Sequence, residues 1–144
     1  MLVRQILKSK ADDGVVTIGP DASVADAANL LSTRKIGSVV VSEDGKVAQG
    51  ILSERDIVRE IGKRGTGCLS ETVAEMMTTE LTTCASDESA DAILAKMTEG
   101  RFRHMPVVEA GHMVGLVTIG DVVKARLTEL AMEKDALEGM IMGH

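Results

Sequence analysis

A short motif, Gly-x-x-[Ser/Thr]-x-x-Asp, occurs twice in the chain and places a hydroxyl and a carboxylate at a fixed spacing. Its copies end in Ser53-Glu-Arg-Asp56 and Thr118-Ile-Gly-Asp121. Each hydroxyl residue ends a strand-like run, and each Asp falls in the first turn of the helix that follows. A hydroxyl beside the free amides of a helix N-terminus suits a phosphate group. A carboxylate can accept two hydrogen bonds from a vicinal diol such as that of ribose.

The same four residues have a purely structural interpretation. Ser53 and Thr118 are good N-cap residues, and Asp56 and Asp121 would complement the helix dipole. One copy alone would favour capping. Because two copies occur, each preceded by glycine in a similar context, ligand binding and capping both stay open at this point.

Signatures of catalysis and of metal binding are absent from the sequence. There is no HExxH, nucleophile elbow, Walker loop or zinc spacing of cysteines, and no GxGxxG follows a strand. The glycine-rich, basic segment 62–67 follows a helix, which indicates a helix end and a linker, with a phosphate loop as the alternative. We therefore expect no catalytic residue, no metal site and no enzymatic activity.

Composition excludes several classes of partner. The chain has 144 residues, with 16 basic and 22 acidic side chains and a net charge of −6, which disfavours nucleic acid and anionic membranes. Phe102 is the sole aromatic residue, so no platform for base stacking exists. No apolar run is long enough to span a bilayer. These features predict a cytoplasmic protein.

The two cysteines, Cys68 and Cys84, do not form a metal motif. Cys84 lies in an apolar-alternating run and is predicted to be a small core residue, whereas Cys68 lies in a glycine-rich connection. Two reduced thiols are the simplest expectation, with a disulfide as the alternative.

The motif belongs to a larger internal repeat. Residues 21–31 match residues 87–97 at an offset of 66, and residues 50–56 match residues 115–121 at an offset of 65. Each copy predicts a β-α-β-β-α unit preceded by a helical stub. The expected stubs are 3–7 and 73–77; the expected strands are 15–18, 38–41 and 47–52, then 81–84, 105–108 and 113–117; the helices follow the caps Ser23 and Ser89 and then cover 54–63 and the segment from 121 onward.

Such a unit is too small to be stable alone, so the two copies should pack face to face about a pseudo-two-fold axis. The predicted fold class is α/β in the α+β sense, with a long C-terminal helix. We expect a first repeat with its stub at residues 1–64, a linker at 65–70, a second repeat at 71–125 and a helical extension at 126–144.

The C-terminal helix, predicted from Asp121 to about Met142, carries a seam of apolar residues interrupted by Lys134. The seam is typical of a dimer interface or of a helix that reports to a partner, and packing on its own module is the alternative. Its apolar residues are Val123, Leu127, Leu130, Leu137 and Ile141, and three exposed methionines are expected at Met132, Met140 and Met142.

The ordered set of motifs resembles a tandem pair of cystathionine β-synthase (CBS) domains, also called a Bateman module. The resemblance covers residues 3–124 and rests on Ser53-Glu-Arg-Asp56, Thr118-Ile-Gly-Asp121 and Arg101-Phe-Arg-His-Met-Pro-Val107. It implies a regulatory sensor that binds an adenosyl ligand such as AMP, ADP, ATP, NAD(H) or S-adenosylmethionine, forms a homodimer and controls a separate protein. The alternative is an interaction module with vestigial pockets.

The resemblance also implies roles for individual residues. Asp56 with Ser53 and Asp121 with Thr118 would hold ribose and phosphate, and an apolar slot would hold adenine. The slot would comprise Val16, Thr17, Ile18, Ile36, Val39, Thr82, Thr83, Cys84, Met105 and Pro106.

The two sites are expected to differ in charge, because the resemblance implies that each is completed by the other repeat. The Asp56 site would gather Arg55, Arg103 and His104, with Arg101 as a further candidate. The Asp121 site would have a neutral rim of Gly37, Ser38 and Gly120, with Lys35 in reach. The Asp56 site is therefore predicted to bind phosphate more strongly. In the alternative, Arg101 and Arg103 pair with Glu99 and Glu109 on the surface, which is the favoured interpretation for Arg101 alone, and His104 is a packed strand residue.

Overall fold

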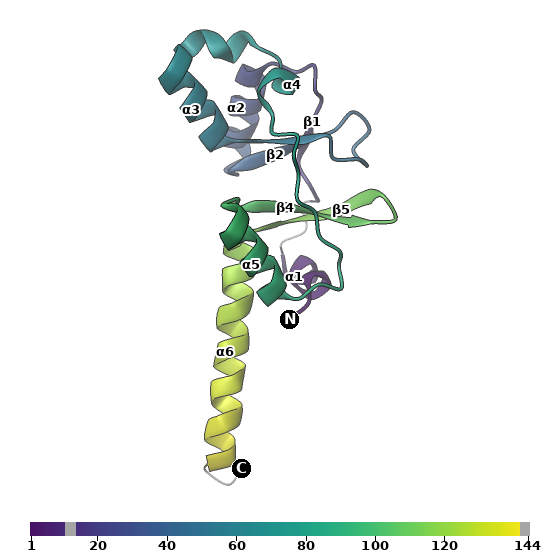
Figure 1. The fold of residues 1–144 in the computed structure, drawn as a ribbon, viewed down its shortest axis with the longest axis vertical. Coiled ribbons are helices and arrows are strands. Elements are labelled where there is room, and N and C mark those ends of the chain that lie inside the picture. Colours follow the sequence, from purple (N-terminus) through teal and green to yellow (C-terminus); the bar gives the residue numbers. More distant parts are fainter. Residues whose placement is uncertain (11–13, 142–144) are drawn as a thin grey trace.

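A computed structural model of the chain describes residues 1–10 and 14–141 and shows two stacked α/β halves with a projecting C-terminal helix (Figure 1). The first half and its connection contain α1 (Val3–Ser9), β1 (Thr17–Ile18), α2 (Val24–Arg34), β2 (Ser38–Val41), β3 (Gly50–Ser53), α3 (Glu54–Arg64), a 3-10 helix, η1 (Thr66–Ser70), and α4 (Val73–Met76). The second half contains α5 (Ala90–Gly100), β4 (His104–Glu109), β5 (His112–Thr118) and α6 (Ile119–Ile141).

Each half has its own small sheet, as expected for the mixed α/β class. In the first sheet, β1 pairs in parallel with β2, and β2 pairs antiparallel with β3. In the second, β4 and β5 form an antiparallel hairpin whose turn has Ala110 and Gly111 at φ of 51° and 79°. Positive φ at both turn residues matches the twist of the strands, which confirms the predicted hairpin.

Helix N-termini form where the sequence predicts them. The hydroxyl oxygens of Ser23 and Ser89 accept hydrogen bonds from the amides of Asp26 (3.0 Å) and Ala92 (3.2 Å) and so cap α2 and α5. The helix that follows the second motif begins at Ile119, two residues before the expected start. The end predicted near Met142 lies outside the described residues.

Strand boundaries differ from the prediction in several places. Residues 81–84 form no strand; within this described run, only Cys84 pairs, in an isolated parallel bridge with Val107. β3 begins at Gly50 instead of at residue 47, because the Asp44 carboxylate accepts hydrogen bonds from the amides of Lys46 and Val47 and holds them in a turn. β1 is likewise two residues shorter than expected.

Two helical stubs are exchanged between the halves. α1 contributes Val3 and Ile6 to the core of the second half, where they meet α5, β4, β5 and α6. α4, which follows the first half in sequence, contributes Val73 and Met76 to the core of that first half. α1 precedes the first repeat in the chain but covers the sheet of the second half, and α4 precedes the second repeat but covers the sheet of the first half. Both contacts cross the domain boundary that the sequence predicts.

The first glycine of each motif lies under an exchanged stub. A Cβ atom on Gly115 would lie 2.7 Å from Leu7 Cδ2, and one on Gly50 would lie 2.5 Å from Met77 Sδ and 3.0 Å from the carbonyl oxygen of Thr78. Only glycine allows this close approach without displacement of the neighbour. The repeated glycine therefore serves the packing of the stubs.

Both cysteines are buried and free, so the alternative of a disulfide is wrong. Burial raises the pKa of the Cys84 thiol to about 11, with Glu88 adding to the effect. Across residues 1–10 and 14–141, no helix has both the length and the apolar character needed to cross a membrane.

Candidate functional site

The two motifs have nearly the same geometry. Ser53 donates its amide to Asp56 Oδ2 (3.0 Å) and accepts the Asp56 amide on its hydroxyl (3.2 Å). Thr118 donates its amide to Asp121 Oδ2 (2.9 Å) and accepts the Asp121 amide on its hydroxyl (3.2 Å). Helix capping is therefore confirmed for both motifs, and the reciprocal bonds hold each carboxylate in a defined position.

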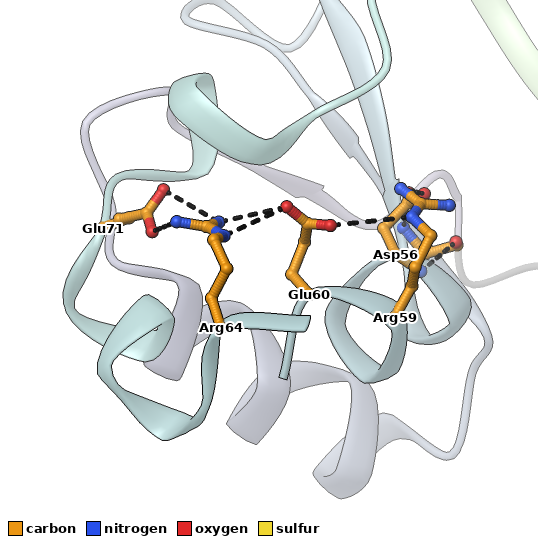
Figure 2. A network of polar contacts seen from close by, with 6 residues as sticks. Asp56, Arg59, Glu60, Arg64 and Glu71 are labelled. Atoms are coloured by element: carbon orange, nitrogen blue, oxygen red, sulfur yellow. Dashed lines mark hydrogen bonds and ion pairs between the residues drawn. The ribbon is translucent and has the colours of Figure 1, made fainter. Parts of the chain in front are cut away.

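Each motif carboxylate is also paired with a cation. Arg59 Nη2 lies 3.0 Å from Asp56 Oδ1, and this pair begins a chain of charges along α3 through Glu60 and Arg64 to Glu71 (Figure 2). Asp121 Oδ2 instead accepts from Lys10 Nζ at 2.8 Å, and the same ammonium donates to the Leu116 carbonyl at 2.8 Å. Arg59 comes from the helix that carries its partner, whereas Lys10 follows the exchanged helix α1.

The surroundings of Asp121 lower the pKa of its carboxyl group. Burial by itself raises the pKa of this carboxyl group, but hydrogen bonds from Lys10 and from Thr118, together with the charge of Lys10, outweigh burial. The pKa of Asp121 therefore lies below its ordinary value, and the group is ionised near neutral pH.

A cavity of about 580 Å³ opens beside the first motif, and we call it the Asp56 cavity. The first half supplies the motif and the second half supplies a basic segment, so both repeats line the same cavity. The residues expected at this site that line it are Ser53, Arg55, Asp56, Thr82, Arg101, Arg103 and His104.

Two arginines of the second half, Arg101 and Arg103, line the Asp56 cavity without an ion-pair partner among the described residues. Neither Arg101 nor Arg103 lies within ion-pair distance of a carboxylate among the described residues. Glu109, the expected partner of Arg103, accepts from the Ser86 amide (2.8 Å) instead. The alternative of surface ion pairs is therefore wrong. Arg101 and Arg103 give the cavity a positive wall suited to an anion, and Glu54 and Glu80 line other parts of the same cavity.

His104 lies between the Asp56 cavity and a second cavity and lines both of them. Burial lowers the pKa of its imidazole, the nearby Glu54 carboxylate opposes that effect, and the charges of Arg103 and Lys10 add to it. The side chain is therefore neutral in the empty protein at pH 7.

The second cavity has a volume of about 400 Å³ and lies beside the second motif. Thr118 comes from the second half, and the first half supplies Gly37 and Ser38. The rim is not neutral as expected, because Lys10 and Arg34 also line it. Gly120, Lys35 and the motif carboxylate Asp121, which were expected here, do not line this cavity.

An unsatisfied hydroxyl lies in the wall of this second cavity. Ser38 is 5% exposed, and its Oγ has no hydrogen-bond partner in the part of the chain that the structure describes. Because a buried polar atom without a partner costs free energy, this hydroxyl is available to a ligand.

The predicted adenine slot is only partly present at the cavity walls. Val16 and Ile36 line the second cavity, and Thr82 lines the Asp56 cavity. Cys84, Val39 and Met105 are buried in the cores instead, and the remaining residues, Thr17, Ile18, Thr83 and Pro106, line neither cavity.

Three basic residues of the two sites were not predicted from the sequence: Lys10, Arg34 and Arg59. Arg59 has a detectable signal, since it follows Asp56 by three residues on a helix. Lys10 has none, because its contact with Asp121 depends on the exchange of α1 between the halves.

Comparison with known proteins places this geometry in a family. The family model described as "CBS domain" matches residues 3–63 and 73–128. "CBS domain-containing protein CBSX3, mitochondrial" of Arabidopsis thaliana is 33% identical over 148 residues, which cover 98% of this chain and 72% of that protein. In CBSCBSPB2 of the same plant, 30% identical over 138 residues, the match covers 95% of this chain and 24% of the relative.

Solved structures agree with this assignment. The CBS-domain containing protein ATU1752 from Agrobacterium tumefaciens has a TM-score of 0.82 and 44% identity, over 88% of this chain and 99% of that one. A CBS domain pair of protein MJ0100, solved with 5′-methylthioadenosine and S-adenosyl-L-methionine, has a TM-score of 0.76 and 27% identity (90% and 98% covered). CBSX2, solved with AMP, has a TM-score of 0.72 and 26% identity (88% and 96% covered). With its two motifs, exchanged stubs and paired cavities, this chain belongs to the CBS domain family.

Proposed function

We propose that this chain is a regulatory sensor that binds an adenosyl ligand and acts in trans on a separate protein. The observation that carries the proposal is the Asp56 cavity. There the Asp56 carboxylate, held in a fixed position, lines a single space together with four arginine side chains: Arg59, which pairs with Asp56, and Arg55, Arg101 and Arg103. A diol acceptor at one side and guanidinium groups at the other match the sugar and the phosphate of a nucleotide.

The charge of the Asp56 cavity favours a phosphate-bearing ligand. Structural neighbours were solved with AMP and with S-adenosyl-L-methionine. The sulfonium of S-adenosylmethionine is a cation and would be repelled by the arginines, whereas the phosphates of AMP, ATP or NAD(H) would be attracted. We therefore propose an anionic adenine nucleotide for this cavity.

The second cavity is proposed as a second adenosyl site. Its support is the apolar pair Val16 and Ile36 together with the unsatisfied hydroxyl of Ser38. Such a wall suits a flat heterocycle with polar edges. A ligand diol at Asp121 would have to displace or share the contact with Lys10.

The competing function is an interaction module with vestigial pockets. The observation in its favour is that Lys10 already occupies the Asp121 carboxylate. In this case partners would bind through exposed faces such as α6, without regard to nucleotide. A role without catalysis, a cytoplasmic location and a homodimer are parts of our proposal in both cases.

The test is thermal unfolding of the purified protein with AMP, ATP, NAD⁺, NADH, adenosine and S-adenosylmethionine. A ligand at 100 times its Kd should stabilise the native state by about 2.7 kcal/mol. We expect a shift with AMP that is lost in Asp56→Ala and retained in Asp135→Ala, an exposed control on α6. Because Asp56→Ala also removes a helix cap, the shift is compared within each variant.

Two outcomes would contradict the sensor. One is the absence of a shift with every ligand in protein shown to be free of bound nucleotide. The other is a shift of equal size in the wild type, Asp56→Ala and Asp121→Ala, which would place binding elsewhere.

A further inference from the structure

The C-terminal helix carries an exposed apolar stripe that its own half does not cover. The stripe positions follow one another at alternating steps of four and three residues, the spacing of a coiled-coil seam. We call them the α6 stripe: Val123, Leu127, Leu130, Lys134, Leu137 and Ile141. Its apolar members are 42–83% exposed.

The α6 stripe is separate from the face that packs on the protein. Val122 and Ala125 are buried in the core of the second half. Since successive residues are about 100° apart on a helix, the centre of the stripe lies about 100° around the helix from Val122 and about 160° from Ala125. The C-terminal part of α6 extends away from both halves, with no other element beside it (Figure 1).

We infer that the α6 stripe binds the same stripe of a second copy of this chain in antiparallel orientation. In this register Val123 meets the partner's Ile141 and Leu127 meets the partner's Leu137. Leu130 meets the partner's Lys134. All six positions are used. Each a position of the heptad (127, 134 and 141) lies opposite a d position of the partner (137, 130 and 123), as antiparallel pairing requires. The two-fold axis passes level with Met132, whose side chain points away from the stripe.

The charges beside the stripe select this orientation. The N-terminal part of the seam is flanked by Lys124, and the C-terminal part is flanked by Glu133 and Glu138. Antiparallel pairing places Lys124 beside the partner's Glu138, twice in the dimer. Parallel pairing would place Glu133 beside the partner's Glu138 and Lys134 opposite the partner's Lys134. Opposite charges favour the first arrangement and like charges disfavour the second.

The centre of the antiparallel pair also fits. Ala131 lies near the axis, where a small side chain allows the two helices to approach closely. The stem of Lys134 can cover the partner's Leu130 while its ammonium reaches water. The two Glu133 side chains approach one another here, a like-charge contact that counts against the pair, and the Lys134 ammonium lies 3.8 Å from Glu138 Oε1 of its own helix.

The inference deepens the homodimer in the proposed function, and its test does not depend on ligand. Sedimentation equilibrium of the full chain should show a dimer. Leu127→Glu should raise the dissociation constant by roughly 100-fold or more, because it buries a carboxylate opposite the partner's Leu137 in an apolar layer of the seam. Met132→Glu, which makes the same kind of change on the opposite face of α6, should leave the constant unchanged.

A charge exchange tests the orientation. Lys124→Glu and Glu138→Lys should each weaken the dimer, and the double variant should recover most of the loss, because these residues meet only in antiparallel pairing. A monomeric wild type would overturn the inference, as would a dimer unaffected by Leu127→Glu or a double variant no better than the single ones. If AMP still stabilises a monomeric Leu127→Glu variant, the sensor stands whatever the outcome for the dimer.

Discussion

Lys10 Nζ lies 2.8 Å from Asp121 Oδ2, in the role that Arg59 has 3.0 Å from Asp56 Oδ1 in the other motif. The two contacts are alike in charge but differ in origin. Arg59 belongs to the helix of its own motif, so a ligand at Asp56 disturbs a single helix. Lys10 belongs to the segment after α1, so a ligand at Asp121 competes with a contact that ties the exchanged stub to α6.

Removal of the Lys10 ammonium should strengthen the binding of uncharged adenosine at the second cavity. Lys10→Met frees the Asp121 carboxylate, so the diol no longer competes with an ion pair that is worth up to about 1 kcal/mol at this exposure. We expect about a fivefold lower Kd by calorimetry, with Lys8→Met on the preceding helix α1 as the control. An unchanged or higher Kd would show that Lys10 does not compete with the ligand.

Loss of Arg103 should weaken phosphate binding in the Asp56 cavity without weakening the binding of the nucleoside. A charge-assisted hydrogen bond is worth about 1.5–3 kcal/mol, so Arg103→Ala should raise the Kd for AMP by about 10- to 100-fold. The Kd for adenosine should change little, and Arg4→Ala, an exposed position on α1, should change neither. Equal losses for AMP and adenosine would mean that Arg103 shapes the cavity instead of binding phosphate.

His104 should make the empty protein less stable in mild acid. Burial lowers the pKa of its imidazole in the folded state, while the unfolded chain titrates near 6.5. The unfolded chain therefore binds more protons as the pH falls below about 6.5, and the free energy of unfolding decreases there.

Urea denaturation at pH 8, 7, 6 and 5.5 checks this dependence on His104. The decrease should be smaller in His104→Asn and unchanged in His112→Asn, whose side chain is exposed. A pH dependence that is the same in the wild type and His104→Asn would show that another group is responsible.

The motif glycines should be needed for packing. Gly50→Ala and Gly115→Ala place a Cβ within 3 Å of the residues that cover them, and overpacking of this kind typically costs about 1–3 kcal/mol. Gly50→Ala should cost more, because the Thr78 carbonyl oxygen cannot move as the end of the Leu7 side chain can.

Gly62→Ala is the matched control for these packing variants. The new Cβ on α3 would meet no atom within 4 Å, and alanine is the better helix former, so this variant should be neutral or stabilised. Chemical denaturation of the three variants gives the comparison. Equal stability of all three would mean that the stubs are not seated on the glycines.

Local pattern was sufficient to predict most of the secondary structure. The caps Ser23 and Ser89, the tight turn at Gly111 and the apolar spacing of α2 and α5 act over a few residues, so their signals are present in the sequence. The predicted strand at 81–84 was wrong because alternation is only a local signal. A strand also needs a neighbouring strand to pair with, and within this run only Cys84 has such a partner.

The sequence by itself determined the duplication, the two capping motifs and the segment from which the arginines of the Asp56 cavity come. It also determined the heptad spacing of α6. Each of these is a property of residue type and spacing along the chain, and each survives any arrangement of the two halves.

Only the tertiary structure decided which half each stub covers. It thereby also decided the charge of the second cavity, because Lys10 follows the exchanged stub α1 and lines that cavity. Lys10 and Asp121 are far apart in sequence, and no local pattern links them. The exchange of α1 and α4 is set by the burial of Val3, Ile6, Val73 and Met76 in cores that form only when both repeats are folded. The contact between Lys10 and Asp121 is therefore a consequence of packing.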